Sequence, residues 1–183
     1  MSKLPDLFPQ RAEALRAALA QRILVLDGAM GTMIQRLKLT EKDFRDERLA
    51  QHSKLLQGNN DLLCLSQPEA ILDIHRAYLA AGADLIETNT FSGTTIAQAD
   101  YELEFIVDEL NEKASQLARQ AADEFTANNP QRPRFVLGAM GPTNRTASLS
   151  PEVTNPGYRN TSFAELRDAY KQQAKALIKG GAD

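Results

Sequence analysis

The chain has 183 residues, 43% apolar and 25% charged, which is typical of one globular domain and excludes a disordered or fibrous chain. Its 21 basic and 24 acidic residues give a net charge of −3 with no long run of either sign, which argues against nucleic acid or an anionic membrane as a partner. The single cysteine, Cys64, cannot form an internal disulfide, and no apolar stretch marks a signal peptide or a membrane span, so we predict a cytoplasmic protein.

The first part of the chain alternates between helical and strand-like patterns. Apolar residues at helical spacing predict a helix over 10–21, which we assign to an N-terminal helical extension, residues 1–22. The short apolar runs 23–26 and 61–65 are typical of strands that are buried on both faces. The polar stretch between them, 36–57, predicts an exposed helical excursion.

The second part of the chain repeats this alternation. A helix that starts with the capping-box spacing of Ser66 and Glu69 and ends at Gly82 leads into a third strand over 83–87. The remaining predicted elements are a helical stretch over 94–127, a strand over 135–137, a long loop over 141–156, and a helix that begins with the capping box Ser162–Glu165 and ends at Gly180.

Four strand–helix units with parallel strands predict an α/β fold. A closed (β/α)8 barrel of the TIM type needs about 250 residues, so we expect 23–183 to be its N-terminal half, with about four βα units and truncated before the fifth strand. The sequence Gly-Ala-Asp at 82–84 recurs at 181–183, which suggests that another strand begins where the sequence stops. An open doubly wound sheet of four or five strands is the alternative.

Polar residues follow the first predicted strand, and α/β folds bind ligands at the carboxyl ends of their strands. Gly28 and Gly31 permit a sharp turn that directs backbone N–H groups towards a ligand anion, and Asp27 offers an acceptor for an ammonium group. The same residues are also consistent with a tight corner alone, in which Asp27 caps the next helix.

Four consecutive hydrogen-bonding side chains, Glu87, Thr88, Asn89 and Thr90, end the third predicted strand. Each buried polar group left without a partner costs about 1–3 kcal/mol, so this run favours a binding site or a buried network. Alternation along a strand places Glu87 and Asn89 on one face and the two threonines on the other. All four can therefore meet one ligand only if the strand ends within the run.

Other candidate residues favour structural roles. The segment 59–61 precedes the second predicted strand, so we expect it at the opposite end of the barrel as a structural cap. Arg145 could clasp a carboxylate, although a single loop arginine is more often a surface contact. His52 and His75 lie on different predicted helices and do not suggest a catalytic base or a zinc pair, and Cys64 is typical of a small buried apolar residue. We predict no catalytic residue and no metal-ligand set within the chain.

Four segments of the chain are similar to a known family: ILVLDGAMGTMIQ (23–35), GNNDLLCLSQPEAI (58–71), AGADLIETNTFSGTTIA (81–97) and GAMGPTNRTASLSPEV (138–153). They resemble the N-terminal homocysteine-binding module of cobalamin-dependent methionine synthases, within the homocysteine S-methyltransferase family. The resemblance covers nearly all of the chain after residue 10. GNNDLL and GPTNRTASLSPEV look particular to the cobalamin-dependent members.

The resemblance implies a (β/α)8 barrel that binds homocysteine at the carboxyl ends of its strands. It also implies a zinc ion, held by three cysteines from later strands, that presents the homocysteine thiolate to methylcobalamin. Those cysteines are not in this chain, so we expect it to transfer no methyl group by itself. Methyltetrahydrofolate and cobalamin modules are the implied partners. The implied substrate-binding residues are Asp27, Gly28, Ala29, Glu87, Thr88 and Asn89.

Two alternatives to this function stay open. One is a non-catalytic half-barrel that binds a small molecule or a second half-barrel. The other is an open-sheet enzyme for phosphorylated metabolites, for which only Arg145 offers a basic group. Ala29 stands where glycine is common in the family, so if that position needs a positive φ, the corner must be shaped differently here.

Overall fold

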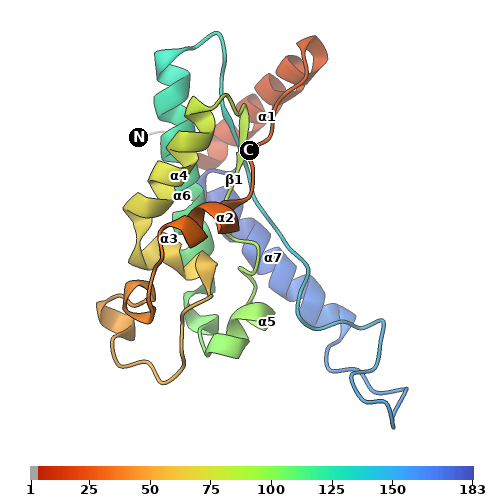
Figure 1. Ribbon diagram of the computed structural model, residues 1–183. Coiled ribbons are helices and arrows are strands. Elements are labelled where there is room, and N and C mark those ends of the chain that lie inside the picture. Colours follow the sequence, from red (N-terminus) through yellow and green to blue (C-terminus); the bar gives the residue numbers. More distant parts are fainter. Residues whose placement is uncertain (1–3) are drawn as a thin grey trace.

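The computed structural model describes the backbone of residues 4–183 and the side chains from residue 9 onward; residues 1–3 of the predicted extension lie outside the described residues. The chain is an α/β structure (Figure 1). Its helices are α1 (Leu4–Gln21), α2 (Met30–Arg36), α3 (Leu63–Ser66), α4 (Pro68–Ala80), α5 (Thr95–Gln98), α6 (Val107–Asn128) and α7 (Phe163–Gly180). Its strands are β1 (Leu85–Glu87) and β2 (Phe135–Leu137). Short 3₁₀ helices are η1 (Glu41–Phe44), η2 (Glu47–Leu49), η3 (Asn60–Leu62), η4 (Ala99–Tyr101) and η5 (Glu104–Ile106).

β1 and β2 are adjacent and parallel, with Ile86 opposite Val136. On the other edge of β1, Leu26 forms a parallel bridge with Leu85, so the first predicted strand lies beside β1. On the free edge of β2, the N–H of Asp183 donates to the carbonyl of Val136 at 2.9 Å. Asp183 therefore lies beside β2.

The second predicted strand, 61–65, is wrong. This segment forms η3 and α3, and its side chains Leu62, Leu63 and Cys64 are fully buried. A short apolar run has no periodicity that distinguishes a strand from a buried helix, so the pattern did not decide between them. The described residues hold two parallel strands and one bridged segment in place of the four predicted strands.

The first predicted strand, 23–26, is not buried on both faces. Ile23 is 90% exposed and Val25 is 54% exposed, and only Leu26 forms a bridge. The carbonyl of Val25 still accepts hydrogen bonds from the N–H groups of Asp84 and Leu85, at 2.7 and 3.1 Å. The segment is thus aligned with β1, while the described elements leave its apolar side chains uncovered.

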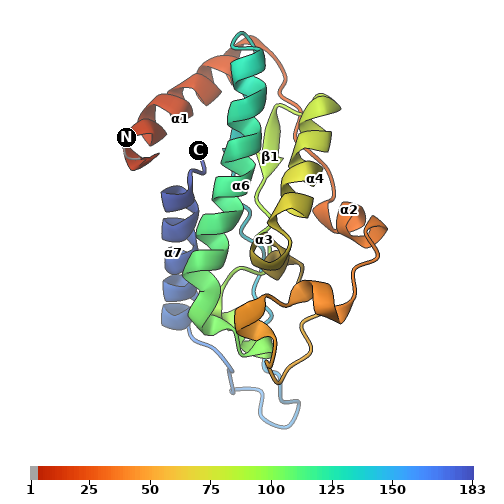
Figure 2. The same cartoon turned by 90° about the vertical axis from the view of Figure 1, so that its left-hand side faces the viewer.

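The helices pack around α6, which lies between α4 and α7 (Figure 2). The buried core combines side chains from α3, α4, α6 and the strands; its fully buried members include Leu63, Ile71, Ile86, Leu110 and Val136. Among the described helices, none is both long and apolar enough to cross a membrane. The segment between β2 and α7 contains neither helix nor strand and extends away from the packed helices (Figure 1).

Helix starts agree with the sequence where a capping box forms. The box of Ser162 and Glu165 at the start of α7 is confirmed, since both of its hydrogen bonds are present. The box predicted at Ser66 is wrong, because α4 starts after Gln67, with Pro68 in its first turn and no side-chain cap. The helix predicted over 10–21 begins earlier, at the start of α1. The predicted excursion 36–57 contains η1 and η2.

Asp84 lies just before β1 and its side chain is fully buried. Its carboxylate accepts two hydrogen bonds from Arg22 and one from Arg132, all at 2.8 Å, and one from the N–H of Val25 at 3.0 Å. Burial opposes ionisation, but the hydrogen bonds from Arg22 and Arg132 hold the pKa of Asp84 well below its usual range. The ionised carboxylate therefore joins β1 to the preceding strand segment.

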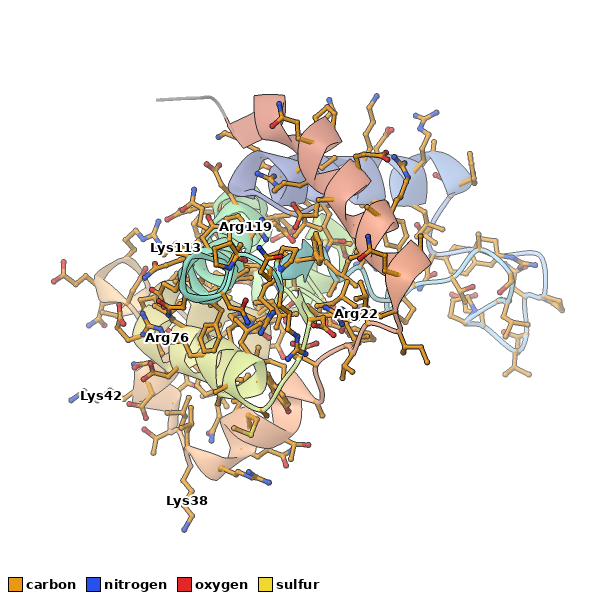
Figure 3. All side chains as sticks on the ribbon, turned by 90° about the horizontal axis from the view of Figure 1, so that it is seen from above. Arg22, Lys38, Lys42, Arg76, Lys113 and Arg119 are labelled. Atoms are coloured by element: carbon orange, nitrogen blue, oxygen red, sulfur yellow. The ribbon has the colours of Figure 1, made fainter. Side chains whose placement is uncertain are left out.

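Asp183 repeats this arrangement beside β2. Its buried carboxylate accepts hydrogen bonds from the N–H of Val136 at 3.0 Å and from Arg119 at 3.0 Å, and it pairs with Arg11. Arg119 is buried, whereas the side chain of Lys38 extends outward from the edge of the molecule (Figure 3). The two Gly-Ala-Asp sequences thus make equivalent contacts, Asp84 with the segment 23–26 and Asp183 with β2.

The close packing of α7 on α6 depends on Gly180. A Cβ added there would lie 2.4 Å from the carbonyl oxygen of Glu112 and 2.6 Å from the Cβ of Ser115, both on α6. We expect Gly180→Ala to lower the free energy of unfolding, measured in urea, by about 2 kcal/mol, because the overpacking outweighs the better helix propensity of alanine. Gly157→Ala, where the nearest atom is 3.9 Å away, should stay within about 0.5 kcal/mol. Equal stability of the two variants would contradict this packing.

Candidate functional site

A cavity of about 530 Å³ opens at the carboxyl ends of β1 and of the segment 23–26. All six residues that the sequence analysis assigned to substrate binding line it. They are joined by residues from the η3 region, from the turn after β1, and from the start of the loop after β2. The full lining is Asp27, Gly28, Ala29, Met30, Gly31, Gly58, Asn59, Asn60, Asp61, Glu87, Thr88, Asn89, Thr90, Phe91, Ser92, Tyr101 and Ala139.

Asp27 is held at the edge of β1. Its carboxylate accepts a hydrogen bond from the N–H of Glu87, at 3.1 and 3.2 Å to the two oxygens, and no side chain caps α2. The alternative in which Asp27 caps the next helix is therefore wrong. Burial raises the pKa of Asp27 to about 6, against the hydrogen bond from Glu87. A half-buried carboxylate that has lost part of its hydration favours a cationic partner.

The corner after Asp27 is compact and does not require a glycine at residue 29. Ala29 has φ −59°, a conformation open to any residue, so the alanine causes no strain. The hydroxyl of Tyr78 donates to the carbonyl of Ala29 at 3.1 Å, and a Cβ on Gly28 would lie 3.1 Å from the Tyr78 ring. Gly28 therefore permits the close approach of α4 to the corner.

The polar run after β1 lines one cavity because the strand ends at Glu87, within the run. The Thr88 hydroxyl accepts a hydrogen bond from the N–H of Ala139 at 2.9 Å and lies 2.6 Å from the Thr90 hydroxyl, which donates to the carbonyl of Ala139 at 2.8 Å. These bonds connect the loops after β1 and β2. Thr88 thus shapes the wall of the cavity, while the Glu87 side chain is exposed.

Asn89 connects the turn after β1 to the η3 region. Its side-chain amide donates to the backbone carbonyl of Asn60 at 2.7 Å. The backbone carbonyl of Asn89 accepts a weak hydrogen bond from the Cys64 thiol at 3.6 Å. Cys64 is fully buried, as the sequence predicted, and burial raises the pKa of its thiol. Cys64 is thus an inert packing residue in this structure.

The segment 59–61 lies in the cavity wall, so its predicted place at the opposite end of the barrel is wrong. The error follows from the second predicted strand: with 61–65 helical, the residues before it no longer mark the entry of a strand. Asn59 pairs with Gln98 through two amide hydrogen bonds, at 2.7 and 3.2 Å. The sequence did contain a signal for this part of the cavity wall, namely three consecutive polar residues directly before a buried apolar run.

Asp61 is the most deeply buried carboxyl group of the cavity, with 4% of its surface exposed. Its Oδ2 accepts a hydrogen bond from the N–H of Ser92 at 2.7 Å. Burial raises the pKa of Asp61 to about 7, although that hydrogen bond acts in the opposite direction. The group is therefore close to half protonated at neutral pH.

The charge of the cavity is one-sided. Its described lining contains the carboxyl groups of Asp27, Asp61 and Glu87 and no Lys, Arg or His. Arg145 is exposed and lies outside the lining, in a separate surface groove. The arrangement is suited to a small ligand that carries a positive group and is held otherwise by amide and hydroxyl groups.

Within residues 4–183, no group of three or more His, Cys, Asp or Glu side chains is placed to hold a metal ion. His52 donates from its ring to the carbonyl of Tyr101, and His75 is buried in α4, away from the cavity lining. Cys64 is buried with a raised thiol pKa. The described residues therefore do not fit a zinc site.

The homocysteine S-methyltransferase family model matches residues 24–183. The match covers most of the chain, and the chain belongs to this family.

The chain is also similar to solved structures of the homocysteine methyltransferase MmuM from Escherichia coli. The oxidized form is 28% identical in sequence, with a TM-score of 0.68. The alignment covers 92% of this chain and 54% of the MmuM chain. The metallated form is 28% identical with a TM-score of 0.67, with 92% of this chain and 55% of that one aligned. The chain thus spans about half the length of these structures.

Proposed function

We propose that the chain is the homocysteine-binding part of a cytoplasmic methyltransferase of the methionine synthase type, built as part of a (β/α)8 barrel. The observation that carries the proposal is that all six residues assigned from the sequence line one acidic cavity. Membership of the homocysteine S-methyltransferase family supports homocysteine as the ligand.

The geometry suggests how the amino-acid part of homocysteine is held. Asp27 accepts hydrogen bonds from the ammonium group, and the described lining holds no Lys, Arg or His that would compete for it. The backbone N–H groups of Gly28 and Ala29 bind the carboxylate of homocysteine. They lie at the start of α2, where no side chain caps the helix. Asn89 lines the pocket beside them, and Thr88 positions its wall.

The proposal includes methylcobalamin as the methyl donor and methyltetrahydrofolate and cobalamin modules as partners of the whole enzyme. The similarity of the segments 58–63 and 141–153 to the cobalamin-dependent members supports this part. Since the described residues do not fit a zinc site, the chain alone should not transfer a methyl group to homocysteine, even with zinc and methylcobalamin added.

Calorimetric titration of the chain with L-homocysteine tests the proposal. We expect saturable binding that Asp27→Asn weakens at least tenfold, because loss of a charge-assisted hydrogen bond is worth about 1.5–3 kcal/mol. Asp73→Asn, which removes an exposed carboxylate of α4 outside the cavity, serves as the matched control and should bind as the unchanged chain does. Absence of binding by the unchanged chain, or equal affinity of the Asp27 variant, would contradict the proposal.

A further inference from the structure

Asp61 accepts a hydrogen bond from the turn after β1 and also borders the cavity. One carboxylate oxygen, Oδ2, accepts the hydrogen bond from Ser92; for the other, Oδ1, no hydrogen bond is present among the described residues. The side chain is 96% buried, and it borders the cavity. The turn after β1 therefore uses only one of the two oxygens.

Holding Ser92 does not require a carboxyl group. An asparagine places the same acceptor oxygen without a charge, and burying a carboxylate without a cation is strongly unfavourable. The turn is also held by other side chains: Gln98 donates to the carbonyl of Ser92 at 3.1 Å, and Gln173 donates to the carbonyl of Thr90 at 2.8 Å. The unused oxygen of Asp61 is thus unexplained by the fold.

The groups that face Asp61 leave its charge uncompensated. Tyr101 and Cys64 lie close to it; burial, and then the charges of Asp100 and Asp61, raise the pKa of the Tyr101 hydroxyl. Across the cavity the titratable groups are Asp27 and Glu87, which are also acidic. The described surroundings of Asp61 lack a positive group, which a ligand could supply.

We propose that Asp61 is a second ligand-binding carboxyl group of the cavity and accepts a hydrogen bond from the ammonium group of the amino-acid ligand. The inference rests on the proposed function. A primary ammonium group has three N–H donors, so one such group can donate to more than one carboxylate of a cavity. In chains where Asp61 is protonated before binding, its O–H bond breaks and the proton leaves to the buffer, while the ligand keeps its own ammonium protons.

The test uses the Ser92 amide, which donates to Asp61, as a reporter in ¹⁵N-resolved NMR. In the free chain the Ser92 signal should titrate with Asp61, and this titration should be absent in Asp61→Asn. Saturating L-homocysteine should lower the midpoint of the Ser92 titration by at least one pH unit. 4-Mercaptobutanoate, which lacks only the amino group, should leave that midpoint in place.

Calorimetry provides the second measurement. At pH 7, homocysteine binding in buffers of different ionisation enthalpy should release protons from the unchanged chain and fewer from Asp61→Asn, whose affinity should be at least tenfold lower. Asp73→Asn is again the matched control.

The outcomes separate the two proposals. If homocysteine shifts the Glu87 amide, which donates to Asp27, but leaves the Ser92 midpoint unchanged, the role of Asp61 is overturned and the proposed function stands. If neither amide responds at millimolar homocysteine, the proposed function fails, and the role of Asp61 fails with it. A shift at both amides together with proton release supports both. Because the NMR readout uses the unchanged chain, a folding defect in Asp61→Asn does not obscure the result.

Discussion

Asp61→Asn should raise the free energy of unfolding at pH 8 by about 4 kcal/mol, the largest change expected from a single substitution here. Burial raises the pKa of Asp61 to about 7 in the folded chain, whereas an unfolded aspartate titrates near 3.8. The folded state therefore binds more protons between these values, so stability falls as the pH rises through this window. Asparagine keeps the acceptor for the Ser92 amide and removes the charge.

Urea unfolding at a series of pH values measures this effect. The advantage of Asp61→Asn over the unchanged chain should be full above pH 7 and almost gone at pH 4. Asp73→Asn, which removes an exposed carboxylate, should follow the unchanged chain at each pH. An advantage that does not vary with pH would show that ionisation of Asp61 is not its source. Together with weaker homocysteine binding, the expected gain would mean that the carboxyl group is kept for the ligand at the expense of stability.

His75→Leu should also stabilise the chain, and more strongly in acid. His75 is fully buried in α4, and neither ring nitrogen has a hydrogen-bond partner among the described residues. Burial lowers the pKa of His75 to about 4, so the unfolded chain, in which histidine titrates near 6.5, binds more protons in between. The unchanged chain therefore loses about 3 kcal/mol of stability as the pH falls from 6.5 to 4.

The expected gain for His75→Leu is about 1–2 kcal/mol at pH 7.5, because two unpaired polar atoms disappear, and about 2 kcal/mol more at pH 5. Thermal or urea unfolding at the two pH values provides the measurement. The other histidine is the control: His52→Leu leaves the carbonyl of Tyr101 without its donor and should lower stability at pH 7.5. A loss of stability in His75→Leu at both pH values would contradict the expected effect.

Local signals in the sequence were sufficient for both ends of α7. The capping box of Ser162 and Glu165 marks the start of α7, and the left-handed Gly181, with φ 114°, follows its end. The same spacing at Ser66 failed, since Pro68 fixes the start of α4 instead. The strands were harder to predict. Each strand is three residues long, and an apolar run of that size fits a strand or a buried helix equally well.

For the candidate site, position in the chain was more informative than residue type. Asp27 and Asn89 were assigned because they follow apolar runs, and both line the cavity. Asp61 was missed because its placement depended on whether Leu62–Leu65 forms a strand or a helix, which packing against α6 decides. The hydroxyl of Thr88 appeared available in the sequence, and only the structure shows that the backbone of Ala139 engages it.

The two buried aspartates, Asp84 and Asp183, have a consequence for how a strand is aligned with its neighbour. A strand of three residues has few side chains with which to distinguish the correct translation along its neighbour from one displaced by a residue. Asp84 removes this ambiguity for β1, because its carboxylate accepts a hydrogen bond from the N–H of Val25 while arginines hold it in place. Asp183 makes the same kind of contact with the N–H of Val136 in β2. A displaced strand would leave a buried negative charge without its partners. Ionic contacts just before the strand therefore select the correct alignment, which a short apolar run cannot do.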